Sequence, residues 1–285
     1  MRIAISGESP MDFDKALQAK TGVYSVPFHI HLGDVEYLDN GEHANEELFE
    51  YFDKTKKIPR TAAANVGEIR AHFDKILEDH DAIIHFTISS GMSSGYQNAC
   101  NAAEGDPRIH VVDSNSFSLG IGYMAYKAKQ MADEGKSVEE ILAEVENLKK
   151  EVCASLIVKD LWYMAKGGRC SSLIGLLGSV LHIIPLLEVV NGKLANEKKF
   201  QGNIRKLGKK YVETMVSKYS KTDEIDYSLA MVGYSTELHS GVQAAADALK
   251  EMGFKEVVVT KCNATCPCHG GPDVIGFSFR HYKKS

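Results

Sequence analysis

Seven residues of serine, glycine and methionine, SSGMSSG at positions 89–95, follow an apolar run. Residues 91–95 match G-x-S-x-G between a strand-like and a helix-like segment, which is the context of a nucleophile elbow in the α/β-hydrolase fold. In that interpretation Ser93 is the nucleophile and His269 is its base. The chain would then be a serine esterase or hydrolase.

The sequence gives weaker signals for the acid and the oxyanion loop of a hydrolase site. Asp113 and Asp247 both lie between Ser93 and His269, so either would give the chain order Ser, Asp, His. Asp113 follows Ser93 by only one helix and one strand, which is early for the acid of this fold. We find no upstream segment that resembles the H-G-G-G loop supplying oxyanion donors in many such enzymes.

The same segment suits a binding site that needs no nucleophile. A helix starting near Gly95 presents unpaired N–H groups and the positive end of its dipole. The hydroxyls of Ser93 and Ser94 can donate to the oxygens of a phosphate or carboxylate at that point. Similar turn-rich segments occur at residues 59–68 with Thr61, at 113–122, and at 165–172, where Arg169 beside two glycines suits an anionic group.

Three of the six cysteines and one histidine crowd into CNATCPCH, namely Cys262, Cys266, Cys268 and His269. This spacing admits a metal-dependent module. Structural zinc sites, however, usually have a second ligand pair further along the chain, and none follows here. We therefore expect no metal, and free thiols in a reducing compartment.

Composition excludes several classes of partner. The 285 residues carry a net charge of −5, so we expect no broad attraction to nucleic acid or to an anionic membrane. Lysines concentrate in residues 198–210, which we interpret as a solvated helix face, with a docking patch as the alternative. The N-terminus does not resemble a signal peptide, and glycines, a histidine and a proline interrupt the apolar stretch 173–190. We predict a cytoplasmic protein without a transmembrane segment.

The first half of the chain alternates strands and helices. Apolar runs predict strands at residues 2–6, 82–88 and 109–114, and a strand, turn and second short strand within 23–39. Helical spacing predicts helices at residues 11–20, 45–57, 66–80, 96–105, 120–135 and 137–151. Ser137 and Glu140 form a capping-box pattern. This order predicts a mostly parallel sheet with helices on both faces.

The second half also mixes the two kinds of element. Strands are predicted at residues 154–158, 182–190, 227–234, 256–261 and 274–279, and helices at 173–181, 204–219 and 238–253. The fold class is therefore α/β. We place two α/β domains at residues 1–153 and 154–285.

Six segments, taken in order, carry a resemblance to a known family. They are TAAANVGE (61–68), SSGMSSGYQNA (89–99), DSNSFSLGIG (113–122), YMAKGGRCSS (163–172), IIPLLEVVNGKL (183–194) and HGGPDVIG (269–276). Together they resemble the DegV family of bacterial fatty-acid-binding proteins over essentially the whole chain.

This resemblance implies a long-chain fatty acid such as palmitate, buried in a tunnel between two α/β domains. Thr61 and Ser93 would hold its carboxylate beside Ser94, with His269 and Arg169 close by. The resemblance also implies a carrier without catalysis of its own and without a cofactor. A separate ATP-dependent fatty acid kinase subunit would phosphorylate the carboxylate to acyl phosphate for phospholipid synthesis, and His269 and Arg169 would assist that transfer.

The physical chemistry of such a ligand agrees with a dry tunnel that has a small polar end. Each buried CH₂ gains about 0.8 kcal/mol, so sixteen carbons gain roughly 12 kcal/mol before the ordering costs of binding. A buried carboxylate is costly unless it is hydrogen-bonded. Residues 173–187 are candidates for the apolar lining, with ordinary core packing as the alternative.

The chain departs from the family pattern at several positions. Ala62-Ala63-Ala64-Asn65 follows Thr61 where the family has S-Q-P-S, and the first strand ends in Gly7-Glu8-Ser9 in place of Asp-Ser. Ile184 and Gln201 stand where basic residues are common, although Arg205 is near, and these two changes bear on the docking of a kinase subunit. The Cys-Pro-Cys before His269 is also unusual for the family.

Overall fold

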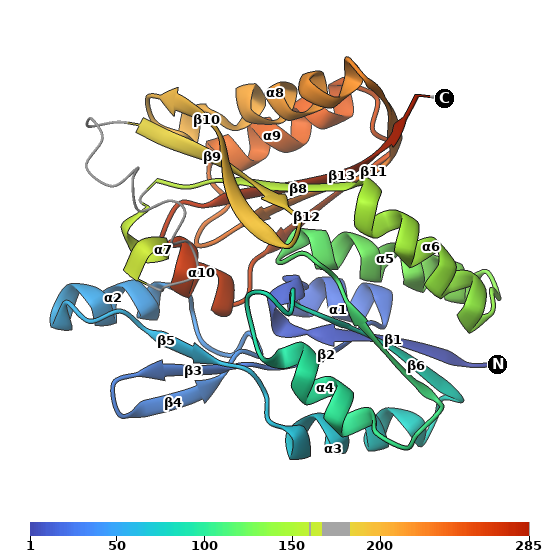
Figure 1. Ribbon diagram of the computed structural model, residues 1–285. Helices are drawn as coiled ribbons and strands as arrows, with labels where there is room; N and C mark the ends of the chain where they lie inside the picture. Colours follow the sequence, from blue (N-terminus) through green and yellow to red (C-terminus); the bar gives the residue numbers. More distant parts are fainter. Residues whose placement is uncertain (160, 167–182, 285) are drawn as a thin grey trace.

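The computed structural model describes residues 1–159, 161–166 and 183–284 (Figure 1). Its first sheet has the strand order β2-β1-β6-β7 and is parallel throughout. The strands are β1 (Ile3–Glu8), β2 (Tyr24–Val26), β6 (Ala82–Thr87) and β7 (Ile109–Asp113). Every residue of β1 and β6 is buried, as the apolar runs predict for central strands covered on both faces.

Helices cover both faces of this parallel sheet. On one face, Ala4 and Ile83 pack against α3 (Val66–Leu77) and α4 (Gly95–Ala103). On the other face, Ile84 and Phe86 pack in a core shared with α5 (Leu119–Asp133) and α6 (Val138–Glu151). The prediction of a parallel sheet between two helical layers is confirmed, as is the capping box at Ser137.

A second, mixed sheet contains strands from the later part of the chain in the order β10-β9-β8-β13-β11-β12. These are β8 (Val152–Ile157), β9 (Ile183–Val190), β10 (Lys193–Gln201), β11 (Asp223–Tyr234), β12 (Glu256–Lys261) and β13 (Ile275–Lys283). Figure 1 shows α8 (Gly208–Ser220) and α9 (Ser240–Glu251) side by side over one face. The other face meets α5, because Leu229 and Met231 of β11 belong to the core that contains α5. Helix α5 is thus packed between the two sheets.

Three small elements complete the part of the fold that surrounds the site. Strands β4 (Val35–Leu38), β3 (His29–Leu32) and β5 (Arg60–Ala62) form an antiparallel sheet, with α2 (Glu46–Thr55) between β4 and β5 in the chain. Helices α7 (Trp162–Lys166) and α10 (Thr265–Gly270) lie near α2 in Figure 1. The remaining elements are α1 (Lys15–Thr21) and the 3₁₀ turns η1 (Ser9–Met11) and η3 (Ile204–Lys206).

Two predicted helices have different bounds. The helix predicted at residues 11–20 begins only at Lys15, because Asp12 has a left-handed φ of 60° and Asp14 caps the N–H of Leu17. The helix predicted at 204–219 is broken into η3 and α8. At that break Gly208 passes so close to α9 that a Cβ would overlap with the carbonyl oxygen of Gly241.

The interpretation of residues 198–210 as one helix face was wrong. Lys198 and Lys199 lie on β10, an edge strand that the sequence pattern did not reveal and that pairs with β9. Lysines are suited to such a position, because charged side chains discourage pairing with another sheet edge.

Other expectations are met in part or stay predictions. The strand predicted at 182–190 is confirmed as β9, whereas the helix predicted at 173–181 lies outside the described residues. Within the described ranges, the helices are too short or too polar to cross a bilayer. The domain boundary placed after residue 153 falls inside β8 and stays a prediction.

Candidate functional site

A cavity of about 300 Å³ lies between the segments that follow the strands of the first sheet, such as Ile88 and Phe117, and residues of the second sheet, such as Leu156 and Gly276. Its lining is mostly apolar and includes Ile88, Met92, Phe117, Leu119, Leu156, Met164, Leu194 and Val274. Its polar lining residues include Thr61, Ser93, Ser94 and His269. The cavity therefore combines an apolar body with a set of hydrogen-bonding groups, as ligand pockets commonly do.

Residues 88–95 form the loop between β6 and α4, which we call the head-group loop. Its backbone is held from three directions. Glu8 accepts from the N–H of Ile88 at 2.8 Å, the carbonyl of Ser116 accepts from Ser89 at 2.8 Å, and Asp113 accepts from Ser90 at 3.2 Å. These bonds place the loop firmly at the carboxyl end of the parallel sheet, where ligands bind in open α/β folds.

Ser93 lies in the last turn of this loop. Its Oγ accepts a hydrogen bond of 3.1 Å from the N–H of Gly95, so its hydroxyl proton remains available to donate to a ligand oxygen. Ser94 is the N-cap residue of α4, but its side chain makes no capping bond, and it lines the cavity instead. Both serines are therefore placed where the sequence predicted hydroxyl donors.

Thr61 and His269 meet at the same cavity. Thr61 is on β5 and His269 is on α10, and the distance between Thr61 Oγ1 and His269 Nε2 is 2.9 Å. The hydrogen-bonded pair brings a hydroxyl and an imidazole to one polar end. An anionic group there would meet donors from both halves of the chain.

Asp39, a residue that the sequence analysis did not single out, fixes the helix that carries His269. Its buried carboxylate accepts from the backbone N–H groups of Ala264 and Thr265, at 2.6 and 3.1 Å, and from the hydroxyls of Thr265 and Ser9. Asp39 thus caps the start of α10 from a position 225 residues away in sequence. Its position after the second strand of a hairpin gave no signal of this role.

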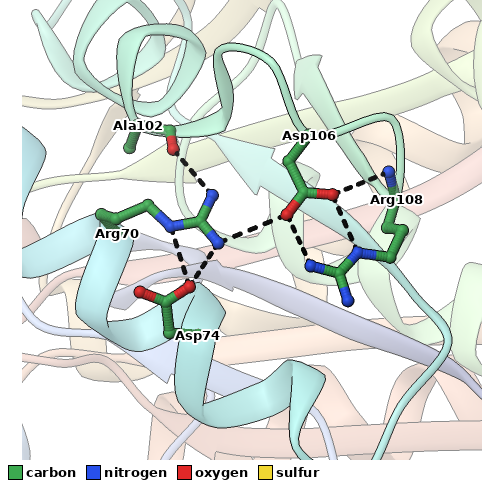
Figure 2. Close-up of polar contacts among 5 residues, drawn as sticks. All are labelled: Arg70, Asp74, Ala102, Asp106 and Arg108. Atoms are coloured by element: carbon green, nitrogen blue, oxygen red, sulfur yellow. Dashed lines mark hydrogen bonds and ion pairs between the residues drawn. The ribbon is translucent and has the colours of Figure 1, made fainter.

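A charged network fixes the other end of α4 (Figure 2). Arg70 of α3 donates to the carbonyl oxygen of Ala102 at 3.3 Å and forms ion pairs with Asp74 and Asp106. Arg108 holds Asp106 at 2.8 Å, and this hydrogen bond is the main reason that the pKa of Asp106 lies well below its usual range. The network ties α4 to α3 and so contributes to the placement of the head-group loop.

The acids considered for a hydrolase have other contacts. Asp113 accepts from the backbone N–H groups of Ser90 and Asn115. Asp247 is on α9, where it contacts Gln243 and Lys250. Within the described part of the chain, α9 contributes no residue to the cavity lining. The role of Ser93 as a ligand donor or as a nucleophile stays a prediction.

The cysteine cluster diverges in space. Cys262 and Cys266 line the cavity, whereas Cys268 packs with Ile30 and Leu48 in a separate core. Burial raises the pKa of all three thiols well above its ordinary value. Among the described residues, no group of three or more His, Cys, Asp or Glu side chains is arranged to hold a metal ion.

Several predicted residues lie elsewhere. Arg169 is outside the described residues. Of the candidate lining at 173–187, the described part, 183–187, packs in β9: Ile184 and Leu186 belong to the core beneath α8 and α9. Gln201 is exposed on β10, and Arg205 pairs with Asp273 and Glu237.

Comparisons with known proteins show likeness over nearly the whole chain. A family model described as an uncharacterised protein of the DegV family matches residues 2–281. A protein of Thermotoga maritima named fatty acid-binding protein is 26% identical over 285 residues, covering 97% of each chain. A DegV family protein from Thermus thermophilus, whose structure is described as fatty acid binding, is 27% identical with a TM-score of 0.85 and full coverage of both chains.

A further solved structure extends the likeness in fold. It is the fatty acid kinase B3 protein of Streptococcus pneumoniae, loaded with linoleic acid, which is 19% identical with a TM-score of 0.81 and covers 98% of this chain and 99% of that one. Because the family model spans nearly every residue of the sequence, the chain belongs to the DegV family.

Proposed function

We propose that this protein binds one long-chain fatty acid, with the acyl chain in the cavity and the carboxylate at Thr61, Ser93 and His269. The observation that carries this proposal is that Thr61 and His269, 2.9 Å apart, and Ser93 all line one mostly apolar cavity. Burial of the chain supplies the affinity. The hydroxyl and imidazole donors offset the cost of removing a carboxylate from water.

We further propose that the protein is a carrier and not an enzyme. It would present the carboxylate to an ATP-dependent kinase subunit, which would form the acyl phosphate used in phospholipid synthesis. His269 and Arg169 would assist this transfer by donating to the developing charge. Support comes from the family resemblance and from the likeness in fold to a fatty acid kinase B protein; Ile184 and Gln201 remove two basic residues common in the family.

The experiment that tests binding is mass spectrometry of the purified protein, weighed intact under native conditions and again after organic extraction. The expected result is one fatty acid for each chain, and delipidated protein that regains one palmitate. Delipidated, folded protein that takes up no palmitate would overturn the proposal. Formation of acyl phosphate from the loaded protein, ATP and a fatty acid kinase catalytic subunit tests the second step separately.

A further inference from the structure

Glu8 is the last residue of β1 and is fully buried beside the head-group loop. Its Oε2 accepts the hydrogen bond from the N–H of Ile88, where the loop begins. Its Oε1 lies against Gly95, where the loop ends, so closely that a Cβ on residue 95 would overlap with it. Glu8 therefore contacts the loop at both of its ends.

The contact at Gly95 leads directly to a ligand-binding residue. The N–H of Gly95 donates to Ser93 Oγ at 3.1 Å, so the position of Gly95 sets the direction in which the Ser93 hydroxyl can donate. The absence of a side chain at residue 95 is what lets Glu8 approach. The second glycine of the G-x-S-x-G motif, Gly95, is thus matched to a carboxyl group from β1.

The surroundings of Glu8 favour a neutral acid. Its Oε1 is buried without a hydrogen-bond partner among the described residues, and a carboxylate with so few donors is costly away from water. Burial raises the pKa of Glu8 to about 8, against the opposing effect of the Ile88 N–H, and the charge of Asp113 adds to the rise.

The two histidines on this side of the sheet supply no positive charge. His85 is on β6 and His72 is on α3, and burial lowers their pKa values to about 3 and about 4. Helix α3 also carries Arg70 and Lys75, but Arg70 pairs with Asp74 and Asp106, and neither cation forms an ion pair with Glu8 among the described contacts. The first turn of α4 carries only Tyr96, β2 carries only Tyr24, and η1 has no titratable residue.

We propose that Glu8 is the positioning residue of the head-group loop and that it fills this role as a neutral acid. This inference rests on the proposed function, because it concerns the loop that holds the ligand carboxylate. Ionised Glu8 would place a buried negative charge behind the loop that faces a second negative charge, and like charges disfavour each other. Fatty acid affinity should therefore be high while Glu8 is protonated and should fall as pH rises through 8. By linkage, bound ligand must make Glu8 harder to ionise.

The test compares the affinity for palmitate of the wild-type protein and of Glu8→Gln, which keeps the size of the side chain and cannot ionise. Both are titrated from about pH 6.5 to about pH 9.5, a range that spans the pKa of Glu8. The titration of palmitate itself affects both proteins alike and cancels in their ratio. Between the acidic and the alkaline end we expect about a tenfold loss of affinity for wild type, which corresponds to one pKa unit, and no such loss for the variant.

Equal pH profiles for the two proteins would overturn the role of Glu8 while leaving fatty acid binding intact; failure of both to bind at every pH would instead overturn the proposed function. If Glu8→Gln does not fold, carbon-13 NMR of wild-type protein labelled at glutamate carboxyls answers the same question. A glutamate that titrates near pH 8, and higher after loading with palmitate, supports the proposal. Titration of every glutamate near the ordinary value of about 4 contradicts it.

Discussion

Thr61 Oγ1 and His269 Nε2 are 2.9 Å apart although the two residues are separated by 208 positions in sequence. The pair joins β5, which belongs to the small antiparallel sheet, to α10, which follows the last strand but one of the mixed sheet. The polar end of the cavity is thus closed by contacts between distant parts of the chain. Four predictions follow from this geometry and from the groups around it.

Thr61→Val should weaken palmitate binding by about 1–3 kcal/mol, because the change removes one donor to a buried carboxylate and leaves its size almost unchanged. Isothermal titration of delipidated protein measures the loss. Thr214→Val is the matched control, since the hydroxyl of Thr214 bonds only to a carbonyl of its own helix on the exposed surface of α8. An unaltered affinity in Thr61→Val would remove Thr61 from the head-group site.

Ser93→Ala should also lower palmitate affinity, by a comparable amount, since it removes the hydroxyl that Gly95 orients. Ser90→Ala in the same loop is the control, because Ser90 is exposed and contributes its backbone N–H to the loop. A fluorophosphonate probe applied to both proteins examines the hydrolase alternative. Labelling of wild type that disappears in Ser93→Ala would show a nucleophile and would count against a role in binding alone.

His269→Gln should spare most of the palmitate affinity, because the glutamine amide can still donate to the carboxylate. It should reduce acyl phosphate formation, because the imidazole is proposed to support charge during phosphoryl transfer. The measurement is the rate of acyl phosphate formation from the palmitate-loaded variant with ATP and a kinase subunit. His80→Gln, at a half-buried position after α3 that does not line the cavity, serves as the control. A variant with the wild-type rate would contradict the assignment of His269 to the transfer step.

Protein stability should decrease as pH rises from about 6.5 to about 8. Burial raises the pKa of Glu8 to about 8 and that of Asp12 to about 7, so in this window the folded state binds more protons than the unfolded state, and stability falls with rising pH. The buried His72 and His85, with lowered pKa values, act in the opposite direction only below about 6.5. Denaturant unfolding at several pH values measures the slope. Glu8→Gln should reduce it, and a flat wild-type profile would show that these acids are not neutral in the fold.

Sequence patterns predicted those parts of the fold that depend on local signals. The apolar run at 82–88 predicts a strand that is buried on both faces, and the capping box predicts the start of the helix at 137–151. Both elements are confirmed. The edge strand β10 was missed, because Lys193–Gln201 alternates poorly and gains its strand character from pairing with β9. Register with a partner strand is a tertiary property that such a segment does not display.

The same distinction applies to the site. Ser93 and Ser94 stand in a turn-rich segment after β6, where hydroxyl and glycine residues gave a usable signal, whereas Thr61, expected in a turn-rich segment, lies on the short strand β5. Glu8 and Asp39 gave none, because each acts on backbone groups far along the chain, at Ile88 and at Ala264. A buried carboxyl group must find hydrogen-bond donors, and which carboxyl groups are buried depends on the complete fold.

The capping of α10 by Asp39 has a consequence for biosynthesis. A ribosome produces Thr61, Asp39 and the head-group loop long before it produces Ala264 and His269, so the emerging chain lacks both the helix and the partner that close the polar end of the cavity. On the proposed function, fatty acid capture at this site must wait until synthesis has passed residue 269. A nascent chain, or one truncated before that residue, would then not bind fatty acid.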